Sequence, residues 1–267
     1  MADSRPIGVF DSGLGGLTVA KALQTLLPNE SIVYFGDTAR VPYGNKSREL
    51  IKEYSLEIAD FLMKHNAKMI VVACNTASAL ALDELQQHCI LPVIGVINPG
   101  AAEAIKATKN DHIGIIGTVA TVSSKAYEKA LQGLNVDIKT SSQACPLLVP
   151  LAEEGWLEGE VTNSIVKHYL LPLNNNEIDT LILGCTHYPL LKDVIANQVN
   201  NDTILIDSAA AVARAVKESL LETNQLYDGD EKGTLMCYVT DIPMRFEDVG
   251  QRFLGSPMDH VQTVHDI

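Results

Sequence analysis

Two cysteines stand at matching positions in two similar stretches of the chain. The first stretch, Met69–Ala77 (MIVVACNTA), contains an apolar run that ends in Cys74. The second, Thr180–His187 (TLILGCTH), contains an apolar run that ends in Cys185. A thiol, whose reference pKa of about 8.5 falls at a helix N-terminus, can serve as a base when ionised and as an acid when protonated. Two thiols on opposite sides of one ligand therefore predict inversion of a stereocentre, with a proton removed from one face and returned on the other.

The residues around the two cysteines are small and polar, and no lysine or arginine adjoins them. Backbone N–H groups at helix N-termini can hold carboxylates without a side-chain cation, so a small amino acid is the predicted ligand. Asp11 is interpreted either as the partner of an ammonium group or as a capping residue only. His187 is interpreted either as part of the site or as a solvated residue of a first helical turn. The other polar candidates are Ser12, Asn75, Thr76, Thr118, Thr121 and Thr186.

We expect each cysteine to lie at the carboxyl end of a β-strand, because each follows a short apolar run of the kind that forms a buried parallel strand. In open α/β sheets, ligands bind at the carboxyl ends of the strands. A strand pattern opens the first half of the chain at Ile7, 67 residues before Cys74 (74 − 7). Another opens the second half at Ile113, 72 residues before Cys185 (185 − 113). The repeated order at similar spacing predicts a duplicated α/β unit.

We expect a fold of the α/β class with two pseudo-symmetric domains, each a mostly parallel sheet flanked by helices, and the active site in the cleft between them. Asn98-Pro99 is an N-cap followed by a proline at the first helical position, and we place the crossing into the second unit there. The expected first domain is residues 1–97 plus 208–267, and the expected second domain is residues 98–207. The two cysteines should then line the cleft on either side of one small ligand.

Strand and helix patterns alternate along the chain. The glycine-rich turn Asp11–Gly16 predicts either an anion-binding backbone nest or a simple tight turn, and Pro42-Tyr43-Gly44 predicts a rigid turn. The expected strands are Ile7–Phe10, Ile32–Phe35, Ile70–Ala73, Val93–Ile97, Ile113–Ile116, Val136–Lys139, Thr180–Gly184, Thr203–Ile206 and Gly233–Thr240. The expected helices are one that ends at Leu27, one that Ser47 caps, Ser78–His88, one from Pro99, Ser124–Leu131, Leu147–Glu154, Val161–Leu171, Ala209–Leu221 and Pro243–Leu254.

Composition and charge narrow the class of protein. The 267 residues are 46% hydrophobic and 20% charged, which is typical of a well-packed globular chain. The net charge of −13 argues against binding of nucleic acid or of an anionic membrane through a basic surface. No apolar run approaches the roughly 18 residues of a membrane span, and the start lacks a signal-peptide pattern, so we expect a cytoplasmic protein. In that compartment five cysteines do not predict a disulfide framework, and Cys89, Cys145 and Cys237 are interpreted as small buried apolar residues.

Four short motifs occur in order over nearly the whole chain. They are Asp11-Ser12-Gly13 with Gly15-Gly16, Pro42-Tyr43-Gly44, Cys74-Asn75-Thr76-Ala77 and Gly184-Cys185-Thr186-His187-Tyr188-Pro189. This set resembles the motifs of the glutamate racemases, in the aspartate/glutamate racemase family. The resemblance implies an isomerase that interconverts L-glutamate and D-glutamate with no cofactor and no metal. It also implies a role in supplying D-glutamate for bacterial peptidoglycan synthesis, and hence for the cell wall and cell shape.

The resemblance further implies a role for each site residue. Cys74 and Cys185 are implied as the two acid/base residues, with Cys74 facing D-glutamate and Cys185 facing L-glutamate, and with Asp11 and His187 assisting their protonation. Glu153 is implied to lie near the site, behind the substrate contacts, and the chain is implied to form a homodimer. The implied substrate contacts are Asp11, Ser12, Tyr43, Gly44, Asn75, Thr76, Thr186 and His187, together with Thr118 and Thr121.

Four other functions are open at this point. An aspartate racemase would share the fold and the chemistry, but that relative has an acidic residue after Cys-Thr in the second cysteine motif, and His187 stands there in this chain. A metal-dependent hydrolase could use Cys74, Cys185, His187 and Asp11, but the chain has no close ligand pair such as C-x-x-C. A thiol redox enzyme is disfavoured by the same absence. A noncatalytic amino-acid-binding protein would not need duplicated thiols.

Overall fold

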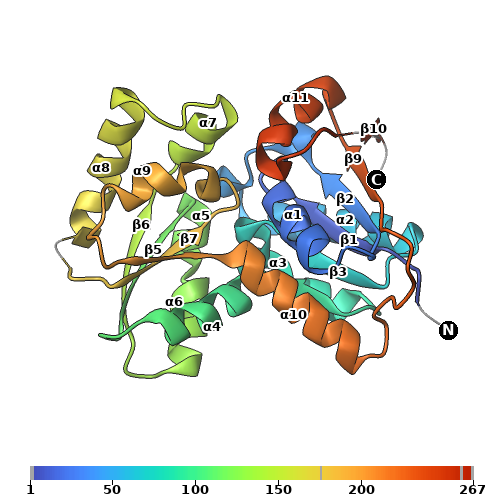
Figure 1. The fold of residues 1–267 in the computed structure, drawn as a ribbon, viewed down its shortest axis with the longest axis horizontal. Coiled ribbons are helices and arrows are strands. Elements are labelled where there is room, and N and C mark those ends of the chain that lie inside the picture. Colours follow the sequence, from blue (N-terminus) through green and yellow to red (C-terminus); the bar gives the residue numbers. More distant parts are fainter. Residues whose placement is uncertain (1–2, 175, 259–260, 266–267) are drawn as a thin grey trace.

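The computed structural model describes residues 3–174, 176–258 and 261–265. It has two lobes, each built around one parallel β-sheet (Figure 1). The strands are β1 (Ile7–Asp11), β2 (Ile32–Gly36), β3 (Met69–Val72), β4 (Val93–Gly95), β5 (His112–Gly117), β6 (Lys139–Ala144), β7 (Thr180–Gly184), β8 (Ile204–Asp207), β9 (Leu235–Val239) and β10 (Val261–Thr263).

The two sheets share one strand order. The first sheet runs β10-β9-β2-β1-β3-β4 and the second runs β6-β5-β7-β8, so the order β2-β1-β3-β4 is repeated by the four strands of the second unit. All neighbouring strands in both sheets are parallel. Strands β9 and β10, near the C-terminus of the chain, extend the first sheet beyond β2. The predicted fold class, two pseudo-symmetric α/β units with mostly parallel sheets, is confirmed.

Helices connect most of the strands, as right-handed parallel α/β units require. The α-helices are α1 (Leu17–Leu26), α2 (Arg48–Lys64), α3 (Asn75–His88), α4 (Ile97–Ala107), α5 (Val119–Ser124), α6 (Ala126–Leu134), α7 (Leu148–Glu153), α8 (Glu160–Asn174), α9 (Lys192–Ala196), α10 (Ser208–Glu222) and α11 (Pro243–Leu254). Short 3₁₀ helices span Thr38–Arg40, Tyr43–Asn45 and Tyr188–Leu191. Over the residues described, no helix combines the length and the apolarity needed to cross a membrane.

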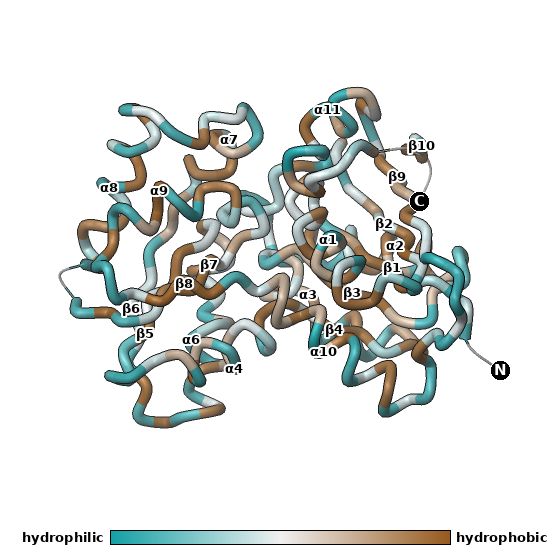
Figure 2. The backbone as a smooth tube through the Cα atoms, in the orientation of Figure 1, coloured by the Kyte–Doolittle hydropathy of each residue, from teal (hydrophilic) through white to brown (hydrophobic). Residues whose placement is uncertain are grey.

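Apolar side chains are buried on both faces of the first sheet. Ile7 and Val9 of β1 belong to a cluster that also contains residues of α1, α10 and α11, whereas Phe10 belongs to a cluster with residues of α2 and α3. The first cluster continues into the second lobe, where it includes Ile115 and Leu183. Figure 2 shows the hydrophobic stretches following the strands inside each lobe. One continuous apolar core therefore joins the lobes through α4 and α10, which pack against each other.

The chain passes between the lobes twice, once between β4 and α4 and once between β8 and α10 (Figure 1). At the second crossing Asp207 caps α10, because its side chain accepts a hydrogen bond from Ala209 N at 2.9 Å. The predicted start of α4 at Asn98-Pro99 is wrong. Helix α4 begins at Ile97, so Pro99 lies in its first turn, where a missing N–H removes no intrahelical hydrogen bond.

Other predicted elements also differ from the structure, and β4 ends at Gly95, two residues before the end of the predicted strand. Helix α3 begins at Asn75, three residues before the predicted start, so that Cys74 is its N-cap. The helix predicted from Ser124 is divided into α5 and α6, because Lys125 adopts the left-handed conformation with φ 56°. Strand β6 (KTSSQA) begins where the predicted strand ends, and β10 was not predicted, because both are edge strands with few apolar residues.

Candidate active site

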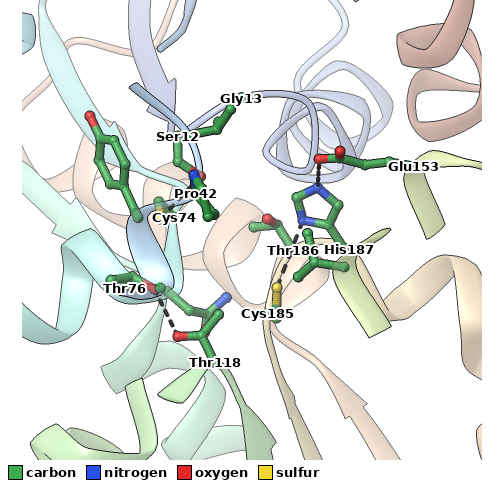
Figure 3. A pocket seen from close by; sticks show the side chains of 15 residues that line it. Ser12, Gly13, Pro42, Cys74, Thr76, Thr118, Glu153, Cys185, Thr186 and His187 are labelled. Carbon is green, nitrogen blue, oxygen red and sulfur yellow. Dashed lines mark hydrogen bonds and ion pairs between the residues drawn. The ribbon is translucent and has the colours of Figure 1, made fainter. Parts of the chain in front are cut away.

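A small cavity of about 50 Å³ lies between the lobes. Residues that follow the carboxyl ends of β1, β3, β5 and β7 line it, as the topology of parallel sheets predicts (Figure 3). Among the predicted site residues, only Asp11 and Thr121 do not line the cavity. The lining residues are Ser12, Gly13, Val41, Pro42, Tyr43, Gly44, Cys74, Asn75, Thr76, Thr118, Val149, Glu153, Cys185, Thr186 and His187.

Cys74 follows β3 and caps the N-terminus of α3. Its Sγ lies 3.8 Å from Ser12 Oγ, and its side chain is buried. Burial, together with the nearby Asp11 carboxyl, raises the pKa of the Cys74 thiol to about 12, although the Ala77 N–H and the Ser12 hydroxyl act in the opposite direction. The lowered pKa expected from a helix N-terminus is therefore wrong for Cys74, because burial outweighs the backbone N–H. This sulfur carries a proton at neutral pH.

Cys185 follows β7 and lies against an imidazole. Its Sγ is 3.7 Å from His187 Nδ1, and His187 Nε2 is 3.0 Å from Glu153 Oε1. Burial alone would lower the pKa of His187, but the hydrogen bonds to Cys185 and Glu153 outweigh it and raise that pKa to about 10. Burial likewise opposes ionisation of Glu153, but the hydrogen bond from His187 lowers the Glu153 pKa. Cys185, His187 and Glu153 thus form a chain of three titratable side chains joined by two contacts, from Cys185 to His187 and from His187 to Glu153 (Figure 3).

His187 is not the solvated residue that one interpretation of the sequence allowed. Its side chain is buried, and its ring packs edge-on against Phe253 of α11 with 5.3 Å between the ring centroids. A protonated imidazole beside a sulfur can give that sulfur a proton or stabilise negative charge on it. His187 therefore places an imidazole beside Cys185, whereas Cys74 has the Ser12 hydroxyl and the nearby Asp11 carboxyl.

Asp11 lies at the end of β1, fully buried behind the cavity wall. Its Oδ2 accepts a hydrogen bond from Gly13 N at 2.9 Å, and its Oδ1 lies 3.3 Å from the Thr186 hydroxyl that donates to it. Burial raises the pKa of Asp11, although His187 and these hydrogen bonds oppose the rise. The carboxyl is thus both a cap for the glycine-rich turn and a link from the first lobe to the second cysteine motif.

Three threonine hydroxyls join the lobes at another part of the cavity. Thr76 Oγ1 lies 3.0 Å from Thr118 Oγ1 and 3.3 Å from Thr121 Oγ1, and the last two are 2.9 Å apart. Thr118 is also the N-cap of α5, since its side chain accepts a hydrogen bond from Thr121 N. Thr121 is buried beneath Thr118, which explains why only Thr76 and Thr118 reach the cavity.

Tyr43 contributes its buried ring and backbone to the cavity wall, because its hydroxyl is already bonded elsewhere. That hydroxyl donates to Asp37 Oδ2 at 2.5 Å, and burial and the Asp37 charge raise the pKa of Tyr43. Arg40 bridges Asp37 and Glu57 and lies over the ring of Tyr54. Asp37 and Arg40 were missed as support for the site, because the polar loop that contains them has no pattern that distinguishes them.

Gly15 is required where the first helix meets the second cysteine motif. A Cβ atom at this position would lie 2.2 Å from Thr186 Oγ1 and 2.6 Å from His187 Nδ1. Only glycine allows so close an approach. The turn before α1 thus packs directly against Thr186 and His187, and this contact does not depend on whether the backbone of the turn also binds an anion.

Two thiols line one cavity, and the groups that contact them differ. In Figure 3, Cys74 lies with Ser12 on one side, and Cys185 lies with His187 on the other. No lysine or arginine is among the cavity-lining residues of the described chain, so hydroxyl, amide and backbone N–H groups are the donors for an anionic ligand. Within the same described residues, no group of three or more His, Cys, Asp or Glu side chains is arranged to hold a metal ion.

The chain is similar to several characterised proteins. Residues 16–216 match the family model described as Asp/Glu/Hydantoin racemase. A glutamate racemase of Geobacter metallireducens is 50% identical over 260 residues, which cover 97% of this chain and 96% of the relative. The crystal structure of glutamate racemase from Francisella tularensis in complex with D-glutamate matches with a TM-score of 0.93 and 41% identity, over 98% of both chains. A glutamate racemase isoform from Bacillus anthracis matches with a TM-score of 0.95 and 43% identity, also over 98% of both chains.

Proposed function

We propose the function of this chain from the premise that it belongs to the Asp/Glu/hydantoin racemase family. Relatives at about half identity over nearly the full length of both chains are glutamate racemases. The chain accordingly interconverts L-glutamate and D-glutamate. Aspartate racemase, the alternative that the sequence left open, is not favoured by these relatives. Supply of D-glutamate to the peptidoglycan of the cell wall is the role consistent with the family.

Two cysteines acting from opposite faces of the substrate, without a cofactor, constitute the proposed mechanism. From L-glutamate, the Cys185 thiolate takes the α-proton, and the Cys74 thiol gives its proton to the opposite face. The products are D-glutamate, a Cys185 thiol and a Cys74 thiolate, so every proton is accounted for. The reverse reaction uses the same groups with their roles exchanged. The observation that carries this proposal is the presence of one buried cysteine from each lobe at a single cavity.

We propose that the residues around the two sulfurs control the protonation states of Cys74 and Cys185. His187, which is hydrogen-bonded to Glu153, stabilises the Cys185 thiolate when its imidazole is protonated. It can also give a proton to that sulfur. Asp11 acts through Thr186 and through its charge near Cys74. These roles are assigned from the side-chain contacts, and each can be tested by substituting the residue.

The substrate carboxylates are proposed to bind backbone N–H groups and neutral side chains. The first turn of α3 offers backbone N–H groups that have no partner within the helix, together with a favourable dipole, as helix N-termini generally do. We propose Ser12, Tyr43, Gly44, Asn75, Thr76, Thr118, Thr186 and His187 as direct substrate contacts, with Asp11 and Thr121 behind them.

We also propose residues 1–97 plus 208–267 as one domain and residues 98–207 as the other. The distribution of the strands supports this division, because β5–β8 form the second sheet and all the other strands form the first. A cytoplasmic location is proposed as well, and the free thiols of all five cysteines fit a reducing compartment.

A homodimer is proposed from the family resemblance. Sedimentation equilibrium over a range of concentrations tests it, and a monomer at every concentration would contradict it.

Optical rotation of purified, chelator-treated protein with glutamate tests the proposed function. Both L-glutamate and D-glutamate should converge on an equal mixture, because the enantiomers have the same free energy in water, and aspartate should turn over far more slowly. A requirement for pyridoxal phosphate or for a metal ion would refute the two-thiol reaction. Faster turnover of aspartate than of glutamate would refute the substrate.

A further inference from the structure

The side chain of Asn75, the first residue of α3, is held by a hydroxyl from the other lobe. Tyr127 of α6 donates from its phenol to Asn75 Oδ1 at 2.7 Å, and both side chains are buried. The contact crosses between the lobes, since α3 follows β3 of the first sheet and α6 follows β5 of the second. Tyr127 does not line the cavity, whereas Asn75 does.

This hydrogen bond decides which end of the Asn75 amide faces the ligand. A side-chain amide has one carbonyl oxygen, which accepts, and one NH₂ group, which donates. Because Tyr127 occupies the oxygen, the NH₂ group is the end left for the cavity that Asn75 lines. A donor in that position suits a carboxylate, which is an acceptor only when ionised. The opposite orientation would present an oxygen and would repel a carboxylate.

Tyr127 is itself tightly fixed. Its hydroxyl lies 3.2 Å from Ser208 Oγ, at the start of α10, so a phenol that donates to Asn75 can accept from Ser208. Its ring packs against the backbone at Gly184, where a Cβ atom would lie 3.1 Å from ring atom Cε2. A phenol whose ring is buried and packed in this way has little freedom to release the amide.

We propose that Tyr127 is a positioning residue that orients the Asn75 amide so that Nδ2 donates to a carboxylate of the substrate. The inference rests on the proposed function, because it takes glutamate as the ligand. Tyr127 does not touch the reacting atoms and acts through Asn75. Its removal should therefore weaken substrate binding more than it slows the chemical step.

Tyr127→Phe is the direct test, since it removes one oxygen atom and keeps the ring. Without the phenol, the Asn75 amide is no longer held in one orientation, and its charge-assisted hydrogen bond to the carboxylate is weakened. The KM and the calorimetric Kd for glutamate should rise about three- to tenfold, with kcat changed less than about twofold. Ser208→Ala is the matched control, because it removes a hydroxyl from the same buried network but leaves the Tyr127–Asn75 contact, and its KM should stay within about twofold of the parent value. An unchanged KM in Tyr127→Phe, or an equal rise in both variants, would overturn the proposal.

Asn75→Asp tests the orientation by a second route. Aspartate keeps an acceptor for Tyr127 but places an anionic oxygen where the amide donor stood, so glutamate binding should fall by more than about 100-fold. Activity within tenfold of the parent would show that an oxygen, not an NH₂ group, faces the substrate. A parent protein that binds glutamate without racemising it would refute the proposed function and leave the Kd test of Tyr127 in force. A parent that does neither would overturn both.

Discussion

The two sulfur atoms of the site differ in what surrounds them. Cys74 is buried beside Ser12, and its thiol pKa is raised to about 12, whereas Cys185 lies next to an imidazole whose pKa is raised to about 10. One cysteine therefore holds its own proton, and the other has a histidine that can hold a proton for it. The proposed mechanism therefore assigns the two proton transfers to two cysteines whose surroundings differ, although the two lobes are pseudo-symmetric.

Replacing either cysteine by serine should nearly abolish racemisation, because a hydroxyl is far less acidic than a thiol. General acid/base catalysis contributes about 10²- to 10⁴-fold, and the loss should be of that size. The remaining cysteine should still reach the α-proton of one enantiomer. In deuterated water, Cys185→Ser should exchange the α-hydrogen of D-glutamate and Cys74→Ser that of L-glutamate, as read by NMR. Near-parental racemisation by both variants would contradict the two-thiol mechanism.

His187 should make the free energy of unfolding depend on pH. Its pKa rises from 6.5 to about 10 in the folded protein, so its charged form is favoured by folding. That contribution is fully present below about pH 6.5 and is lost as the pH rises through about 10. The free energies of unfolding in urea of the parent and of His187→Asn should therefore differ most at about pH 6.5, should approach each other as the pH rises, and should converge above pH 10. A difference that grows between pH 7 and pH 10 would contradict this assignment.

At the scale of elements, the loop before α1 and the loop after β7 hold each other in place. Gly15→Ala should displace Thr186 and His187, because the added Cβ would overlap both side chains. A misplacement of about 1 Å in an active site can reduce the rate about 100-fold, and we expect a loss of that size in kcat/KM.

Gly133→Ala in α6 is the matched control for this substitution. Nothing lies within 4 Å of the added Cβ, so activity should not change and stability should rise by about 0.5–1 kcal/mol. Circular dichroism should show that both variants fold. Parental kcat/KM in Gly15→Ala would mean that the two loops are not held by this contact.

Most of the elements that carry the site could be predicted, because β3 and β7 are apolar runs that end abruptly at a cysteine. The start of α3 was misplaced because Asn75 and Thr76 look like loop residues when their place in a helical first turn is unknown. Tyr127 could not be found at all. Its contact with Asn75 joins residues 52 positions apart, and such a pairing exists only once both lobes are assembled.

At the scale of the whole molecule, an acidic protein must admit an acidic substrate. A second cavity of about 260 Å³ adjoins the site and shares Gly13, Val41 and Glu153 with it. Arg245 of α11 lines this outer cavity and forms a 2.8 Å ion pair with Glu154, at the end of α7 in the other lobe. Arg245 thus places a positive charge beside the site in a chain of net charge −13, in a cavity that Glu153 and Asp241 also line.

Arg245→Gln should raise the KM for glutamate about two- to fivefold at low ionic strength, since rim charges mainly affect association. The rise should vanish at about 0.5 M salt, where screening is effective within a few ångströms. Arg214→Gln is the control, because it changes the net charge equally. The Arg214 side chain is about as exposed as that of Arg245, and it forms a 2.8 Å pair with Glu103 away from both cavities. Equal effects of the two substitutions would assign the change to net charge alone.

The late position of β9 in the chain has a consequence for synthesis on the ribosome. Strand β2 pairs with β9 between Gly36 and Val239, residues 203 positions apart (239 − 36). At about 5–20 residues per second, the edge of β2 waits about 10–40 s for its partner, and an open strand edge can pair with other chains. Strands β5–β8, by contrast, form a sheet from one uninterrupted segment. The nascent chain therefore passes through a stage in which the sheet made later is complete while the sheet begun first is still open.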